Sequence, residues 1–132
     1  MSILKRILGI CDTKAPLDAW CWTHQDRKID IDLSRAPELS KPGGAIRLEG
    51  QALPEKVLVL HGTDGQFHAF HNKCRHMGRR IDPVPASAKV RCCSVSMATY
   101  DYSGKVVSGT AKGPLKAYRI EAADNKVIIF LE

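Results

Sequence analysis

The sequence predicts an all-β domain, built as an antiparallel sandwich or barrel of short strands. Two observations lead to this fold class. Apolar and polar residues alternate with period two in short runs such as 29–33 and 45–49, which is typical of strands with one buried face. Turn-forming residues separate the runs at short intervals, as at 42–44 and 63–66. Many short strands between turns are typical of sandwiches and barrels.

Along the chain, the expected strands begin only after an N-terminal extension. Residues 1–27 show no strand pattern, and Pro16 ends any helix that begins before it, so we expect an extension that packs on a domain formed by residues 28–132. The expected strands are 29–33, 45–49, 56–61, 67–71, 89–92, 99–102, 105–107, 115–121 and 127–131. Turns at 63–66, 103–104 and 124–125 join three pairs of these strands as hairpins.

Charge and hydropathy narrow the classes of partner. The chain has 20 Lys and Arg against 14 Asp and Glu, a net charge of +6, but only 6% aromatic residues and no nucleic-acid-binding motif. We therefore expect no nucleic acid, and the dense basic group instead favours an acidic protein partner. That group comprises Lys73, Arg75, Arg79 and Arg80.

No apolar run approaches 18 residues, so we expect no transmembrane segment. Lys5 and Arg6 interrupt the first apolar stretch, which argues against an export signal and favours a cytoplasmic protein.

The five cysteines are an odd number, which argues against a closed disulfide framework. In a reducing compartment, thiols serve more often as metal ligands, catalytic groups or core residues. We expect Cys11 and Cys21 to pack in the domain, and Cys92 to behave as a small buried hydrophobic residue. The remaining two, Cys74 and Cys93, are candidate metal ligands.

Cys74 and His76 lie two positions apart on a loop that follows an expected strand. Cys93 stands at the end of another expected strand, with 16 residues between it and His76. Thiolate and imidazole groups both suit iron and zinc. Two hairpin tips that present such ligands can hold a metal centre between them, so the pattern predicts a metal site.

The surrounding residues resemble the Rieske family of [2Fe-2S] proteins. Residues 66–78 resemble the strand and first ligand loop, 100–109 the strand-turn-strand after the second loop, and 111–118 the third loop, which shields the cluster. The resemblance covers residues 28–132 and implies a Rieske-like antiparallel β-sandwich or barrel with two cluster-binding hairpin loops. In this family two cysteines bind one iron and two histidines bind the other.

The ligand set departs from the family pattern at one position. Aligned on the Tyr-Asp pair at 100–101, Ser96 stands where the family has its second histidine. The resemblance implies Cys74, His76 and Cys93 as metal ligands, with Ser96 at the fourth cofactor-binding position. Several alternatives stay open here: Ser96 binds iron as an alkoxide, another side chain replaces it, no stable cluster forms, or the site holds a different, mononuclear metal. The candidate replacements are Cys92 and, from the extension, Cys11, Cys21 and His24.

The resemblance implies an electron-transfer protein, a ferredoxin or small redox subunit, and not an enzyme. Its partner would be an acidic redox protein or oxidoreductase subunit that the basic group attracts. An anionic ligand in place of a neutral histidine predicts a lower reduction potential with weaker pH dependence than in an ordinary Rieske ferredoxin. The rival prediction is a cluster-free Rieske fold that acts as an interaction or regulatory subunit.

Overall fold

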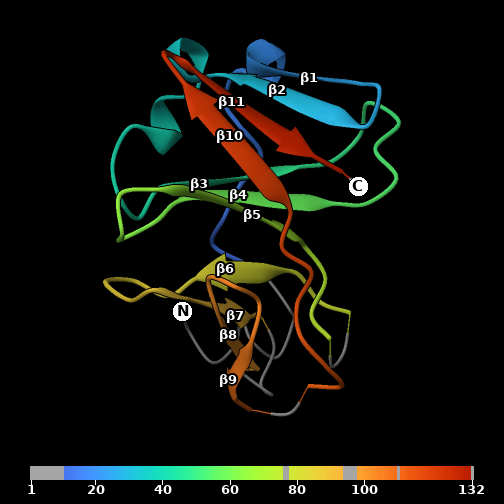
Figure 1. The fold of residues 1–132 in the computed structure, drawn as a ribbon, viewed down its shortest axis with the longest axis vertical. Helices are drawn as coiled ribbons and strands as arrows, with labels where there is room; N and C mark the ends of the chain where they lie inside the picture. The colour runs from blue at the N-terminus through green and yellow to red at the C-terminus, as the bar shows by residue number, and fades with distance from the viewer. Residues whose placement is uncertain (1–10, 76–77, 94–97, 110, 132) are drawn as a thin grey trace.

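The computed structural model describes residues 11–75, 78–93, 98–109 and 111–131, and confirms the predicted all-β class. Three antiparallel sheets follow one another along the long axis of the molecule (Figure 1). The upper sheet has the order β1-β2-β11-β10, the middle sheet β3-β4-β5 and the lower sheet β6-β7-β8-β9. Among the described residues, no helix has the length and apolar character needed to cross a membrane.

The upper sheet forms as its alternating pattern predicts, with one addition. Its strands are β1 (Trp22–Gln25), β2 (Lys28–Asp32), β10 (Arg119–Ala123) and β11 (Lys126–Phe130). In β2, Ile29 and Ile31 are fully buried while the charged residues face outward. The addition is β1, which pairs with β2 although no strand was expected before residue 28. The two turn residues, Asp26 and Arg27, both have positive φ without being glycine, so the sequence lacks the usual hairpin signal.

The middle sheet is buried on both faces. It consists of β3 (Ala45–Leu48), β4 (Val57–His61) and β5 (Phe67–His71). Along β4, Val57 and Val59 pack in the upper hydrophobic core, whereas Leu58 and Leu60 pack in the lower one. The uninterrupted apolar run of β4 therefore couples the two cores, and β5 leads from this shared layer into the first predicted ligand loop.

The lower sheet carries the second predicted ligand loop. Its strands are β6 (Ile81–Pro83), β7 (Lys89–Cys92), β8 (Thr99–Asp101) and β9 (Val106–Ser108). The predicted turn between β8 and β9 is held by the Asp101 carboxylate, which accepts hydrogen bonds from the Ser103 and Lys105 amides at 2.9 and 3.0 Å. Gly104 has a φ of +91°, and a Cβ there would collide with the Leu115 carbonyl oxygen. This contact ties the turn to the segment that precedes β10.

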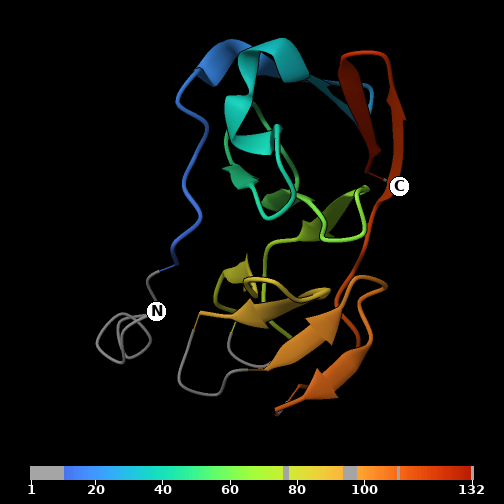
Figure 2. The same ribbon diagram turned by 90° about the vertical axis from the view of Figure 1, so that its left-hand side faces the viewer.

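Residues 11–21 run along one side of the molecule from the lower sheet to the upper one (Figure 2). Asp82 of β6 accepts hydrogen bonds from the Asp12 and Thr13 amides at 2.6 and 3.0 Å. Farther along, the Arg47 amide in β3 donates to the Lys14 carbonyl at 3.0 Å. Residues 12–14 are thus fixed against both the lower and the middle sheet.

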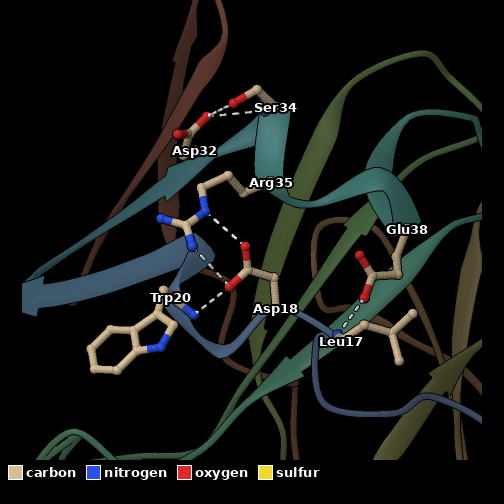
Figure 3. Close-up of polar contacts among 7 residues, drawn as sticks. All are labelled: Leu17, Asp18, Trp20, Asp32, Ser34, Arg35 and Glu38. Carbon is tan, nitrogen blue, oxygen red and sulfur yellow. Dashed lines mark hydrogen bonds and ion pairs between the residues drawn. The ribbon is translucent and has the colours of Figure 1, made fainter.

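Short 3₁₀ helices attach the end of this segment to the upper sheet: η1 (Ala19–Cys21), η2 (Leu33–Arg35) and η3 (Pro37–Leu39). The Asp18 carboxylate caps η1 through the Trp20 amide and binds the Arg35 guanidinium twice, at 2.7 and 3.2 Å (Figure 3). Glu38 accepts from the Leu17 amide at 2.8 Å. The backbone here is held by carboxylates, while the Leu17 and Trp20 side chains remain exposed.

Candidate metal centre

Cys74 and Cys93 are anchored to the same short stretch of chain. Cys74 follows β5, and its amide donates to the Arg79 carbonyl at 2.6 Å. Cys93 follows β7, and its amide donates to the Arg80 carbonyl at 2.9 Å. The fold therefore brings the starts of the two predicted ligand loops to consecutive residues just before β6.

The Cys74 thiol lies in the lower core beside a tyrosine hydroxyl. Its Sγ is 3.6 Å from the Tyr100 Oη, and the Arg75 amide donates to the same Oη at 3.0 Å. Since that oxygen already accepts from Arg75, its own hydrogen can point toward the sulfur. Burial raises the pKa of Tyr100 above its usual range, so the hydroxyl keeps this hydrogen. Cys74 is not disulfide-bonded, and Tyr100 can donate to its thiolate.

Replacing Tyr100 by phenylalanine should change both stability and redox behaviour. Tyr100→Phe removes the acceptor of the part-buried hydrogen bond from the Arg75 amide, which should lower the free energy of unfolding by about 1 kcal/mol. A hydrogen bond to a ligand sulfur stabilises the more negative reduced state, so a cluster bound to Cys74 should also show a lower reduction potential. Denaturant titration and redox titration measure the two effects. An unchanged potential in a cluster-containing variant would exclude the bond from Tyr100 to the sulfur.

Cys93 forms a disulfide bond with Cys11, across 82 residues of sequence. Cys11 is buried, as expected for a packing residue, but its bond to Cys93 was not expected. Three cysteines stay outside the bond, and a pairing over such a separation leaves no local signal. The two Cα atoms are 5.4 Å apart, an ordinary separation for a disulfide. In this state Cys93 has no thiolate to offer a metal.

Cys92 faces the other side of β7. It packs in the lower core with Ile81, Val90 and Cys74, as expected for a buried apolar residue. Its amide donates to the Ala98 carbonyl at 2.8 Å, and its register partner is Ile81, so its backbone belongs to the sheet. Cys92 and Cys93 thus do not converge, as adjacent strand residues should not.

The other predicted site residues fall into two groups. His76 and Ser96 lie outside the described residues, so their roles stay predictions. Cys21 is buried in the upper core, as expected for a packing residue. The His24 ring contacts the Gln51 carbonyl oxygen at 3.0 Å. Among the described residues, the cluster of possible metal ligands consists of Cys11, Asp82 and Cys93.

The basic surface beside Cys74 differs from the predicted one in its members. Arg80 makes two hydrogen bonds to the Glu49 carboxylate, at 2.7 and 3.0 Å, and its charge is thereby offset. Lys112 takes its place, since its amide donates to the Arg75 carbonyl at 3.1 Å. A cavity of about 270 Å³ opens here, lined by His71, Lys73, Cys74, Arg75, Gly78 and Lys112. The sequence signal for Lys112 was its place in the segment that resembles the third Rieske loop.

Glu55 ties the third-loop segment to the end of β5. Its Oε1 accepts from the Tyr118 hydroxyl at 2.5 Å and from the Lys116 ammonium at 3.0 Å, and its Oε2 lies 3.5 Å from the His71 Nδ1. The Tyr118 hydrogen bond, aided by Lys116 and His71, lowers the pKa of Glu55. Burial lowers the pKa of His71, which keeps this ring neutral at physiological pH.

The lowered pKa of Glu55 makes stability depend on pH on the acid side. Its folded-state pKa lies below the ordinary value of 4.5, so its contribution is present above pH 4.5 and is lost as the pH falls through the folded-state pKa. Glu55→Gln should cost about 1 kcal/mol at pH 7, because the carboxylate is partly exposed, and should flatten this acid-side slope. Thermal unfolding between pH 3 and pH 7 measures both, with Glu121→Gln on the exposed face of β10 as control. Parallel pH profiles for wild type and Glu55→Gln would contradict the assignment.

Comparison with known proteins decides the family. A model of the Rieske [2Fe-2S] domain matches residues 32–119. The chain belongs to the Rieske [2Fe-2S] domain family. It is 36% identical over 86 residues to the glycine betaine monooxygenase oxygenase subunit of Pseudomonas aeruginosa, an alignment that covers 57% of this chain and 20% of that subunit. This chain thus corresponds to about a fifth of that relative's length.

Two further relatives extend the comparison. The cytochrome b6-f complex iron-sulfur subunit of Chlorobaculum tepidum is 30% identical over 103 residues, which cover 77% of this chain and 55% of that subunit. The complex of reduced oxygenase and oxidized ferredoxin in carbazole 1,9a-dioxygenase contains a chain of similar fold, with a TM-score of 0.67 and 16% identity. That match covers 82% of this chain and 96% of the other. The Rieske-like fold predicted from the sequence is confirmed.

The Cys11–Cys93 disulfide decides whether both cysteines of the expected pair are available as thiols. With the Cys11–Cys93 disulfide closed, Cys74 is the one loop cysteine of the expected pair that can supply a thiolate. With it open, Cys74 and Cys93 both can, from two loops that meet at residues 79–80. A [2Fe-2S] cluster needs such a pair on its inner iron.

Proposed function

We propose that this protein is an electron carrier whose Rieske-type [2Fe-2S] cluster has an altered ligand set. In its open, dithiol form, Cys74, Cys93 and His76 bind the cluster, and Ser96 stands at the fourth position. The observation that carries the proposal is the meeting of the two cysteine loops within a Rieske domain, with a tyrosine hydroxyl beside Cys74. When bound, such a cluster accepts and donates single electrons.

Cys92 is a less suitable ligand than Cys93. It belongs to the ladder of β7 and packs among apolar side chains, so turning its sulfur toward a loop tip would break strand pairing. Cys93 is the first residue beyond that strand and needs no such change. The protein carries electrons for another protein and does not itself transform a substrate.

The deciding experiment combines metal analysis with a substitution that restores the family pattern. Anaerobically purified, dithiol-treated protein should contain iron and sulfide in equal amounts and absorb visible light. Ser96→His should shift the spectrum to that of an ordinary Rieske protein and raise the reduction potential, because a neutral imidazole replaces an anionic ligand. A colourless protein without iron, in both wild type and Ser96→His, would instead support the cluster-free interaction subunit, which the closed Cys93 disulfide favours.

The partner is proposed to be an acidic redox protein that docks over the cavity beside Cys74. Lys73, Arg75 and Lys112 line this cavity and are exposed. The carbazole dioxygenase complex pairs a ferredoxin with an oxygenase, which is the kind of encounter this surface fits. Steering by such charges raises association rates and weakens with ionic strength.

Reversing the charges on this surface should slow association with the partner. The double variant Lys73→Glu and Arg75→Glu should reduce the association rate constant about tenfold or more at low salt, and the difference should shrink at high salt. Stopped-flow electron transfer to an acidic redox protein measures the rate. Lys28→Glu, an exposed change on β2 in the upper sheet, is the control and should have little effect. Equal slowing by both changes would point to net charge and not to a docking surface.

A further inference from the structure

The Cys11–Cys93 disulfide and the cluster require the same sulfur atom. Cys93 is fully buried and Cys11 is 5% exposed, so the bond lies inside the protein between the N-terminal segment and the end of β7. Cys93 is also the second-loop thiol that the proposed cluster needs. A sulfur atom in a disulfide has no negative charge and binds iron poorly, so one state excludes the other.

The surrounding contacts hold Cys11 in place against Cys93. The Asp82 carboxylate accepts from the amides of the two residues that follow Cys11, at 2.6 and 3.0 Å. Asp82 and Cys93 lie on one face of the lower sheet, and an Asp82 oxygen and both sulfurs lie within 4.8 Å of one another. The Arg47 amide adds a third anchor through the Lys14 carbonyl. Cys11 is thus kept beside Cys93 by backbone hydrogen bonds that do not depend on the disulfide itself.

We propose that Cys11 is a redox-controlled block on Cys93, which closes the cluster site under oxidising conditions and releases it when a dithiol reduces the bond. The inference rests on the proposed function, because it concerns access to the same site. It adds a regulatory residue that lies outside both ligand loops. Asp82 is the positioning residue of this device, since it fixes the segment that carries Cys11.

The opening reaction is a thiol–disulfide exchange. A thiolate of the dithiol attacks the Sγ of Cys11, the more exposed of the two residues, and Cys93 leaves as a thiolate. The second thiol of the reductant then attacks the mixed disulfide and releases Cys11. One S–S bond breaks in the protein and one forms in the reductant, and two electrons and two protons pass to Cys11 and Cys93. A cavity of about 280 Å³ reaches this region and is lined in part by Asp12, Thr13 and Asp82.

The test compares cluster loading with the state of the disulfide in the full chain. Air-oxidised and dithiothreitol-treated samples are loaded anaerobically with iron and sulfide, and iron per chain is measured. The thiols are then alkylated in denaturant with a chelator, which removes the cluster from its ligands, and are located by mass spectrometry. The state of the thiols must be measured beside the iron content, because the added sulfide can itself open disulfides. Iron per chain should rise in proportion to the fraction of chains in which Cys11 and Cys93 are both alkylated. Cys11→Ser should load fully without dithiol, whereas Cys21→Ser, which removes a different buried thiol, should keep the wild-type dependence.

Two outcomes would overturn the inference, and they differ in what they say about the function. Full loading of chains whose disulfide is still intact would show that Cys11 does not block the site, but it would agree with the proposed electron carrier. An absence of iron in both reduced wild type and Cys11→Ser would overturn the block and the cluster together. Since reduced wild type needs no substitution, poor folding of Cys11→Ser would not prevent a decision.

Asp82→Asn provides a readout that is independent of iron. The amide side chain can accept only one of the two backbone hydrogen bonds well, so Cys11 should spend less time beside Cys93. The disulfide should then open at about tenfold lower dithiol concentration than in wild type, which corresponds to the loss of one hydrogen bond to a charged group. Coincident opening curves for the two proteins would overturn the positioning role of Asp82.

Discussion

Opening the Cys11–Cys93 disulfide should lower the free energy of unfolding by about 4–5 kcal/mol, the largest effect on stability expected here. The bond closes a loop over 82 residues of sequence, and the loss of chain entropy in the unfolded state grows with the logarithm of loop length. It also joins the N-terminal segment to the lower sheet. Loss of the disulfide should therefore destabilise most of the domain.

Denaturant titration of air-oxidised and dithiol-treated wild type measures this difference directly. Cys11→Ser should resemble the reduced wild type, and dithiol should change its unfolding midpoint very little. Asp82 and Lys14 still hold the N-terminal segment after reduction, so unfolding should remain cooperative. Equal midpoints for oxidised and reduced wild type would show that the disulfide does not constrain the unfolded chain.

The strands most accurately predicted from sequence are those in which pattern and turn chemistry agree. Phe67–His71 and Lys89–Cys92 have the bounds that the sequence predicts. The predicted turn at 124–125 joins β10 and β11, although β10 begins at Arg119 and not at residue 115. The strand Ile81–Pro83 was missed because three residues ending in proline carry too little pattern. Trp22–Gln25 was missed for a different reason, since it becomes a strand only by pairing with Lys28–Asp32 across a turn of two non-glycine residues. Tertiary pairing, which no local window contains, decides both.

The candidate site shows the same division between local and long-range information. The position of Cys74 on a loop after β5 follows from its neighbours in sequence. The Cys11–Cys93 bond and the hydrogen bond from the Thr13 amide to the Asp82 carboxylate join residues about 70 to 80 positions apart. Nothing in the composition distinguishes Cys11 from Cys21, yet the fold gives one a disulfide partner and places the other in the upper core. Charge pairing is equally hidden, since the sequence groups Arg80 with the basic residues near Cys74 whereas in the fold it pairs with Glu49.

Replacing Cys74 by alanine should abolish cluster binding completely, whatever the state of the disulfide. Cys74 is the loop thiol that lies beside the Tyr100 hydroxyl and outside any disulfide, so no other described side chain can take its place on the first loop. The cost in stability should be modest, about 1 kcal/mol, because a cysteine-to-alanine change removes a single buried sulfur. Iron analysis together with denaturant titration separates loss of the ligand from loss of the fold.

Cys92→Ala is the matched control, because Cys92 is buried in the same lower core as Cys74 and the substitution removes the same sulfur atom. If Cys93 is the second-loop ligand, Cys92→Ala keeps its iron and reduced Cys93→Ala loses it. If Cys92 is the ligand, the two results exchange, and the oxidised protein then loads iron with its disulfide intact. The pair of variants therefore decides which of these two adjacent cysteines supplies the second-loop ligand.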